Sequence, residues 1–363
     1  MNSLSNQMPV SAVRSRTMCA LALLLGLICI SPGWAWERGE RIWIIDENDP
    51  VTTPFLDISQ EVGAWHDHGF LGFALHPSFD QNGYVYLLYL VDRHHLLHCQ
   101  EPAAGVGAPE CDAGHDPNID ETFDASIGRL TRYQAELPPG ASDYSQATQV
   151  NPTTRTVFIG ETISSGIPST SRSHVTGSLV FGTDKTLLVS TGDRARSSGD
   201  AGSAFTVPDA NNYTLQALVD RILHPDQDVG SNRSQMLGSL NGKILRIDPD
   251  TGDGVSSNPY FDNANPRSVE SRVWAFGLRN SFRTSLKPDT GSHDPADADP
   301  GTLVVGDVGR NAWEEINNVE SPGQNFGWPL YEGMDNFDSN NFRSVCTGYS
   351  RHRSIHDHGG CYR

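Results

Sequence analysis

Short apolar runs separated by Gly, Pro, Asn and Asp recur along most of this 363-residue chain. In the clearest case, Asn82-Gly83 separates the apolar runs FLGFAL and YVYLLYL. An Asn-Gly pair between two apolar runs is typical of a β-hairpin. We predict hairpins over 70–90, 177–193 and 282–307, and single strands over 41–46, 128–133, 242–248 and 315–319.

A hairpin with an outer strand, repeated along the chain, indicates an array of small antiparallel sheets. Helical periodicity is limited to a possible short segment near 213–223. The pattern predicts an all-β fold, and we favour a β-propeller with about four blades over a β-sandwich. The Gly-, Asp- and Asn-rich stretches 92–127 and 194–240 are expected to be surface loops.

The N-terminus has the pattern of an export signal. Arg14 and Arg16 precede an apolar run at 18–30, and GWA at 33–35 is a small-residue cleavage site. The run is short for a membrane-spanning helix, although a membrane anchor is the alternative. We expect a signal peptide over 1–35 and a domain over 36–363 that is periplasmic or secreted and not inserted in a membrane.

The charge of the chain restricts its partners. Its formal net charge is −18, and its few lysines are Lys185, Lys243 and Lys287. Nucleic acids and anionic membranes bind clustered basic residues, so neither is an expected partner. A neutral or cationic small molecule is easier to accommodate.

Four cysteines lie beyond the export signal, at Cys99, Cys111, Cys346 and Cys361. An even number is typical of disulfide bonds in an oxidising compartment. The spacing favours pairing Cys99 with Cys111 and Cys346 with Cys361. The other two pairings and free buried thiols are the alternatives.

The main candidate for acid–base chemistry is His174, which precedes the hairpin predicted over 177–193. Asp193 ends the returning strand, so the two side chains are expected at the same end of the hairpin. A neighbouring carboxylate fixes the tautomer of an imidazole and raises its basicity, as a general base requires. The alternative is an unrelated surface histidine and turn aspartate.

Two further strand ends carry candidate ligand groups. Arg279-Asn280 joins a guanidinium fork to an amide, and together they can bind the oxygens of a planar ligand. A structural salt bridge of Arg279 is the alternative. The sequence GDVG at 306–309 offers backbone carbonyls and two glycines, which suit a hard cation such as Ca²⁺.

Three other clusters contain ligand-type residues in weaker patterns. The acids at 248, 250 and 253 resemble a calcium loop, but position twelve is Pro259 instead of glutamate, so we predict a turn. The tetrapeptide HDHG occurs at 66–69 and 356–359, where a metal repeat is the less favoured interpretation. A zinc site is likewise less favoured for His94, His95, His98 and Cys99.

Taken in order, the blocks along the chain resemble a known family. They are GFLGFALHPSFDQNGYVYLLY, HVTGSLVFGTDKTLLVSTGD, LNGKILRIDPDTG, VWAFGLRNSFR, GDVGRNAWEEIN and NFGWPLYEG, within about 41–333. They are similar to the glucose/sorbosone dehydrogenases, soluble aldose dehydrogenases that use pyrroloquinoline quinone (PQQ). The Hedgehog-interacting proteins share this domain.

The resemblance implies a reaction for the candidate pair. His174 would take the proton from the anomeric hydroxyl of an aldose while hydride passes to the quinone, which yields the lactone. Asp193 would orient His174.

The resemblance also implies cofactor and metal ligands. Arg279 and Asn280 would hold the quinone oxygens, which places Arg279 in the catalytic set as well. Asp67 stands where the family has a glutamine or an acid, and both Asp67 and His174 would contact the cofactor. Ca²⁺ would lie near Gly309 and Arg310 and polarise the quinone as a Lewis acid.

The family fold is a six-bladed propeller, so the resemblance implies that the C-terminal blades are missing from this chain. In the family, the later blades supply basic residues that pair with the carboxylates of PQQ. Phe282 also stands where the glucose enzymes have a polar residue. Two alternatives therefore stay open: a non-catalytic binding propeller and a calcium-dependent propeller lactonase. The identities of the sugar and the electron acceptor do not follow from the sequence.

Overall fold

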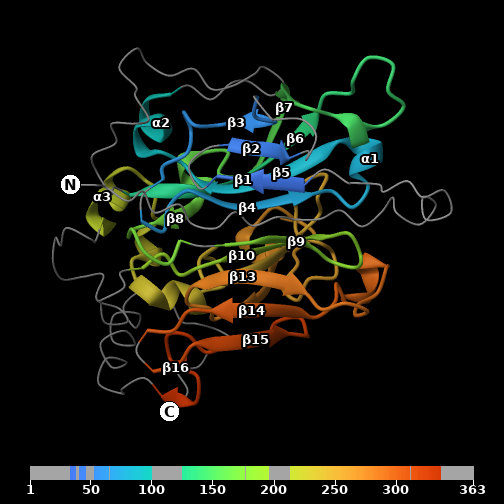
Figure 1. Cartoon of the computed structure of the whole chain (residues 1–363). Coiled ribbons are helices and arrows are strands. Elements are labelled where there is room, and N and C mark those ends of the chain that lie inside the picture. The colour runs from blue at the N-terminus through green and yellow to red at the C-terminus, as the bar shows by residue number, and fades with distance from the viewer. Residues whose placement is uncertain are drawn as a thin grey trace, which may run out of the picture.

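The structure is a computed structural model that describes residues 33–37, 41–45, 53–64, 66–99, 125–175, 177–195, 213–310 and 312–336. These residues form small antiparallel sheets joined by loops and short helices (Figure 1). The fold is therefore mostly β, as the sequence predicts.

Within the described residues, five sheets follow one another in chain order. The first contains β1 (Gly33–Trp36), β2 (Arg41–Ile45) and β3 (Leu56–Asp57). The second contains β4 (Phe70–Leu75), β5 (Tyr84–Leu90), β6 (Ser126–Ala135) and β7 (Val150–Ile159), with β8 (Ile167–Ser169) paired to β6. The third contains β9 (Leu179–Phe181), β10 (Leu187–Thr191), β11 (Lys243–Ile247) and β12 (Val273–Phe276). The fourth contains β13 (Ser281–Leu286), β14 (Leu303–Asp307) and β15 (Glu315–Val319), and the short pair β16 (Tyr331–Glu332) and β17 (Asp335–Asn336) follows.

The described helices are short and lie in the connections. They are α1 (Phe79–Asn82), α2 (Arg93–His98), α3 (Thr214–Val219) and α4 (Val269–Arg272). Short 3-10 helices cover Tyr144–Gln146, Ile163–Ser165, Pro225–Gln227, Gly230–Gln235 and Pro295–Asp297. In the described part of the chain, no helix has the length and apolar character needed to cross a bilayer.

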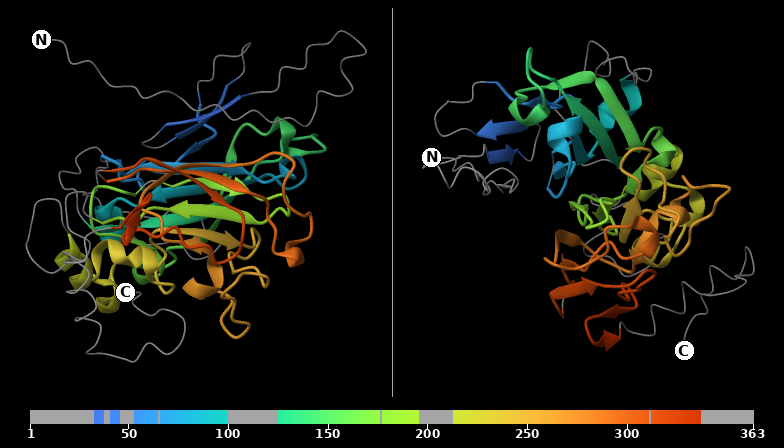
Figure 2. Two further views of the ribbon diagram at one scale, coloured as in Figure 1. Left: turned by 90° about the horizontal axis from the view of Figure 1, so that it is seen from below. Right: turned by 90° about the vertical axis from the view of Figure 1, so that its right-hand side faces the viewer.

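The sheets are arranged along an arc, with the first sheet near one end and β15 and β16 near the other (Figure 2). An apolar core lies between each successive pair of the four larger sheets. Strand β5 shows the principle, because Val85 and Leu87 face one core while Tyr86 and Leu88 face the next. Alternate side chains point to opposite faces, so a strand between two cores becomes a continuous apolar run. A β-sandwich has one core between two sheets, so this arrangement is not a sandwich.

The three predicted hairpins and four predicted single strands are all present. The helix expected near 213–223 is α3. Strand β7 was not predicted, because Pro152 and a run of partly exposed polar residues remove the alternation typical of a strand. Helix α2 lies inside a stretch expected to be a loop, and the Asp92 carboxylate caps it by accepting from the His95 N–H at 2.9 Å.

The predicted end of the signal peptide at residue 35 falls inside β1. Trp34 of this strand is 6% exposed, and its ring contacts those of Phe55 and Phe73 at 4.8 and 5.9 Å between centroids. Cleavage at that point would remove Trp34 from the first core. Most of the signal peptide, at 1–32, and Cys111, Cys346 and Cys361 lie outside the described residues, so the predicted export and disulfide pairing stay predictions.

A buried ion cluster ties the second sheet together. Glu61 is 3% exposed and accepts hydrogen bonds from Arg129 Nη1 at 2.6 Å, Arg155 Nη2 at 2.7 Å and Tyr89 Oη at 2.5 Å. Its donors come from β5, β6 and β7, so one carboxylate joins three adjacent strands. Burial opposes its ionisation, but Arg155 and Arg129 outweigh burial and hold the pKa of Glu61 at about 2.

We predict that Glu61→Gln lowers the free energy of unfolding by about 3–5 kcal/mol, because two buried guanidinium groups each lose a charged carboxylate partner. The folded-state pKa is below the unfolded value, so this stabilisation is complete above about pH 4.5 and is lost as pH falls towards 2. Urea denaturation across this pH range measures both effects. Glu320→Gln, at an exposed site, is the control and should change stability by less than about 0.5 kcal/mol. Equal stability of Glu61→Gln and the native chain at pH 7 would contradict the prediction.

Candidate functional site

His174 and Asp193 meet at one end of the hairpin formed by β9 and β10. The imidazole Nδ1 lies 2.8 Å from Asp193 Oδ1, and the two residues are 5% and 0% exposed. The backbone is tight here, because a Cβ on Gly192 would lie only 2.1 Å from the carbonyl oxygen of His174. The sequence placed these two side chains at the same end of the hairpin, and the structure brings them into contact.

Backbone strain is concentrated at this point. His174 and Arg194 both have left-handed conformations, with φ of 58° and 51°. Such residues cost about 1–3 kcal/mol each and persist only where their surroundings enforce them. The enforcing contacts include Arg194 N–H donating to His174 O at 3.2 Å and His174 N–H donating to Asp67 Oδ2 at 3.0 Å.

Asp67 belongs to the first HDHG sequence, and this sequence binds the loop that carries His174. Asp67 N–H donates to Arg172 O at 3.4 Å, and His68 Nε2 lies 3.2 Å from Ser171 O. In the structure, the Asp67 carboxylate contacts the chain itself and fixes the backbone of His174. The cofactor contact predicted for Asp67 stays a prediction. The second HDHG sequence lies outside the described residues.

The buried Asp193 carboxylate is surrounded by donors. Oδ1 accepts from His174 and from Ala195 N–H at 2.9 Å, and Oδ2 accepts from Trp328 Nε1 at 2.7 Å. Burial alone would raise the pKa of Asp193, but His174, Arg279 and the Ala195 N–H together lower it. Trp328 belongs to the block NFGWPLYEG, but no role was predicted for it, because nothing local connects it to a residue 135 positions away.

Arg279 and Asn280 lie between β12 and β13, each 6% exposed. Their backbone N–H groups donate to the two oxygens of Asp307 at 2.9 and 2.6 Å, which fixes the path of the chain. Burial raises the pKa of Asp307 to about 7, despite these two donors. The Arg279 guanidinium lies 5.2 Å from the ring centroid of Trp328, and Asp193 N–H donates to Arg279 O at 2.7 Å. The candidate base and the candidate cofactor ligand therefore share one site.

The loop at 308–313 is where calcium was predicted. Arg279 Nη1 donates to Val308 O at 2.6 Å and Gly309 O at 2.8 Å. On the opposite side, the carboxylate of Glu332 accepts from the backbone N–H of Arg310 and, at 3.2 Å, from that of Ala312. Arg279 thus already engages the two carbonyl oxygens on this side, and the calcium site stays a prediction.

Side chains that could bind a metal ion do not cluster elsewhere in the described part of the chain. There, no group of three or more His, Cys, Asp or Glu side chains could hold an ion. At the cluster considered for zinc, buried His95 has Nδ1 2.8 Å from Gln60 O, and the rings of His94 and His98 lie tilted with 4.6 Å between their centroids. The predicted turn is confirmed, since Asp248 Oδ1 accepts from the N–H groups of residues 250 and 251.

A buried basic cluster lies behind Asp193. Arg194, Arg233 and Lys243 are at most 1% exposed, and burial lowers the pKa of all three. Lys243 Nζ donates to three backbone carbonyls between 2.6 and 2.9 Å, and Arg233 Nη2 donates to Thr170 Oγ1 at 2.7 Å. Two guanidinium groups and an amine are thus fixed behind the acids of the site.

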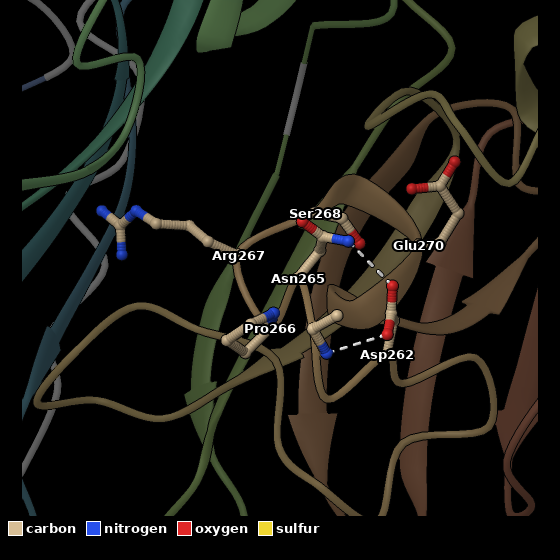
Figure 3. Close-up of a pocket in the computed structure, with 7 residues that line it drawn as sticks. Asp262, Asn265, Pro266, Arg267, Ser268 and Glu270 are labelled. Atoms are coloured by element: carbon tan, nitrogen blue, oxygen red, sulfur yellow. Dashed lines mark hydrogen bonds between the residues drawn. The ribbon is translucent and has the colours of Figure 1, made fainter.

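A surface cavity of about 630 Å³ lies apart from these residues, around the loop that leads to α4 (Figure 3). Partners within the chain already engage the side chains of Asp262, Asn265, Arg267 and Ser268 in its lining. Asp262 accepts from Ala264 N–H and from the Asn265 amide at 2.9 Å, and the Arg267 side chain extends away to bind Asp253 and Glu161. The geometry therefore assigns no chemistry to this cavity, and His174 remains the centre of the candidate site.

Comparisons with known proteins identify a family for the chain. The profile of the glucose/sorbosone dehydrogenase family matches residues 145–352. The chain is 28% identical to the HIPL2 protein of Arabidopsis thaliana over 308 residues, covering 80% of this chain and 36% of that protein. It is 25% identical to quinoprotein glucose dehydrogenase B of Acinetobacter calcoaceticus over 303 residues, covering 83% and 48%.

A solved structure shows the same fold. It is described as a putative oxidoreductase (glucose dehydrogenase) from Thermus thermophilus, with a TM-score of 0.50 and 21% identity over 84% of this chain and 64% of that one. The chain spans about a third to a half of the length of the two curated relatives. On the strength of the matched profile, this chain belongs to the glucose/sorbosone dehydrogenase family.

Proposed function

We propose that this protein oxidises an aldose sugar at its anomeric carbon to the lactone, with PQQ as the acceptor of the hydride. The observation that carries the proposal is the His174–Asp193 pair beside Arg279 in one buried site. Family membership and the similarity to a quinoprotein glucose dehydrogenase support it.

His174 is the proposed general base. If Nδ1 carries the proton and donates to Asp193 Oδ1, the lone pair is on Nε2. The described part of the chain offers Nε2 no hydrogen-bond partner, so Nε2 can accept the proton of a sugar hydroxyl. Asp193 then stabilises the imidazolium that forms.

The residues around Arg279 fit a planar ligand with oxygen acceptors. Arg279 Nε is buried and has no hydrogen-bond partner among the described residues, which leaves a donor for such a ligand. Arg279 and Asn280 would hold the quinone oxygens, and Asp307 keeps both residues in place through their N–H groups. When bound, PQQ supplies an electrophilic quinone carbon that accepts hydride. No step is assigned to calcium, because Gly309 O is engaged by Arg279.

We further propose that the four larger sheets are blades of a six-bladed propeller, with the site at the ends of their strands. The apolar cores between successive sheets support this. The basic and apolar pattern that precedes β1 supports a periplasmic or secreted location, where a small sugar is the expected partner.

A non-catalytic binding domain is the second candidate. It is favoured by one observation: Arg279 Nη1 is satisfied within the chain by Val308 O and Gly309 O, as in a site that needs no ligand. Such a domain would bind no PQQ, so the experiments below separate the two functions. The calcium-dependent lactonase has no comparable support.

We predict that the native chain binds PQQ with a change in absorbance and reduces a dye acceptor when aldoses are added. His174→Ala should keep PQQ binding and lower kcat by about 10²- to 10⁴-fold, because the general base is lost. His224→Ala, at an exposed histidine that precedes the 3-10 turn Pro225–Gln227, is the control and should match the native chain. Absence of PQQ binding and dye reduction in the native chain would contradict the proposed function.

We also predict that Arg279→Lys weakens PQQ affinity by about 10- to 100-fold, since a lysine cannot reproduce charge-assisted contacts from a planar fork. Equilibrium titration followed by absorbance measures the change. Arg283→Lys makes the same replacement at an exposed position on β13 and should leave affinity unchanged. Equal PQQ affinities of the two variants would contradict the proposed contact between Arg279 and the cofactor.

A further inference from the structure

Trp328 lies in the connection between β15 and β16 and is held from both sides of its backbone. Its N–H donates to Gly277 O at 3.0 Å, and its carbonyl oxygen accepts from Gln235 Nε2 at 2.7 Å. The side chain is 6% exposed. With the backbone anchored to the third sheet and its connection, the indole has a fixed direction.

The edge of this indole reaches the Asp193 carboxylate. Nε1 donates to Oδ2 at 2.7 Å, while His174 and Ala195 occupy Oδ1. A carboxylate rotates about its Cβ–Cγ bond unless both oxygens are held. The Trp328 N–H therefore determines whether Oδ1 remains directed at His174 Nδ1.

The face of the same indole contacts a different group. The Arg279 guanidinium carbon lies 5.2 Å from the ring centroid, within the range of a cation–π interaction. Arg279 is buried, and burial lowers its pKa against the attraction of Asp193, Asp307 and Glu332. The ring provides a favourable surface for a cation that has lost most of its water.

We propose that Trp328 is a positioning residue that couples the two halves of the site, with its N–H orienting the Asp193–His174 pair and its ring face orienting Arg279. The inference rests on the proposed function. Packing alone would require only an apolar ring of this volume. A buried N–H aimed at a buried carboxylate is needed only if that carboxylate must stay ionised and oriented.

The two contacts use different parts of the indole, so two substitutions separate them. Trp328→Phe removes the N–H and keeps an aromatic face, and kcat should fall by about 10-fold while the Kd for PQQ changes by less than about 3-fold. Trp328→Leu removes both, and the Kd for PQQ should also rise, by about 5- to 10-fold. Purely structural damage would move kcat, Kd and thermal stability together.

A second measurement needs no cofactor. The His174 Nδ1–H proton, hydrogen-bonded to Asp193, should give a downfield ¹H NMR resonance in the full apo chain. Trp328→Phe should shift this resonance upfield or broaden it. Trp274→Phe is the matched control, since Trp274 is also buried and its ring lies 5.0 Å from the guanidinium of Arg246. Trp274→Phe should leave the resonance, kcat and Kd at their native values.

A double-mutant cycle tests whether Trp328 affects kcat through the Asp193 carboxylate. In an Asp193→Asn background, Trp328→Phe should cause no further loss of kcat, because its N–H acts through the carboxylate. Additive losses, or an unchanged His174 resonance in Trp328→Phe, would overturn the inference. If the native chain binds no PQQ, the proposed function fails by itself, and the NMR comparison still decides whether Trp328 orients Asp193 and His174.

Discussion

A charged carboxylate with no exposure to water must be surrounded by donors, and the site of this protein is built on that constraint at Asp193. Its two oxygens accept from an imidazole, an indole and a backbone N–H. Its own backbone N–H donates to Arg279 O, and its carbonyl accepts from the Asn241 amide at 3.2 Å. Loss of any one donor would leave the buried carboxylate with fewer hydrogen bonds, which costs free energy. The segments that carry these donors are therefore held in one relative arrangement.

The sheets make this convergence possible. Each larger sheet shares an apolar core with the next, so the ends of strands that are distant in sequence are held at fixed separations. Asp67 precedes β4, His174 precedes β9, Asp193 follows β10, and Asp307 ends β14. Rigid strands with polar loop residues at their ends are a common way to position chemistry. The strained backbone of His174 is tolerated because Asp67 and Arg194 hold it from two sides.

Arg279 illustrates how the site balances charge. It faces three acids, Asp193, Asp307 and Glu332, and it donates to the carbonyls of residues 308 and 309. The guanidinium therefore engages the backbone next to Gly309, where a calcium ion was predicted. Its Nε is buried and has no hydrogen-bond partner among the described residues, so it is left for a ligand.

The sequence by itself determined the local elements. Turn residues such as Asn82-Gly83 and apolar alternation fixed the hairpins, and because His174 and Asp193 flank one hairpin, their contact was predictable as well. Strand β7 was not, since its Pro152 and partly exposed polar residues carry no periodic signal. Tertiary structure alone decided the contacts between sheets, including Asp67 with His174 across 107 residues and Trp328 with Asp193 across 135. Local contacts follow from turn chemistry and side-chain period, whereas these distant ones depend on how whole sheets pack, which no short segment encodes.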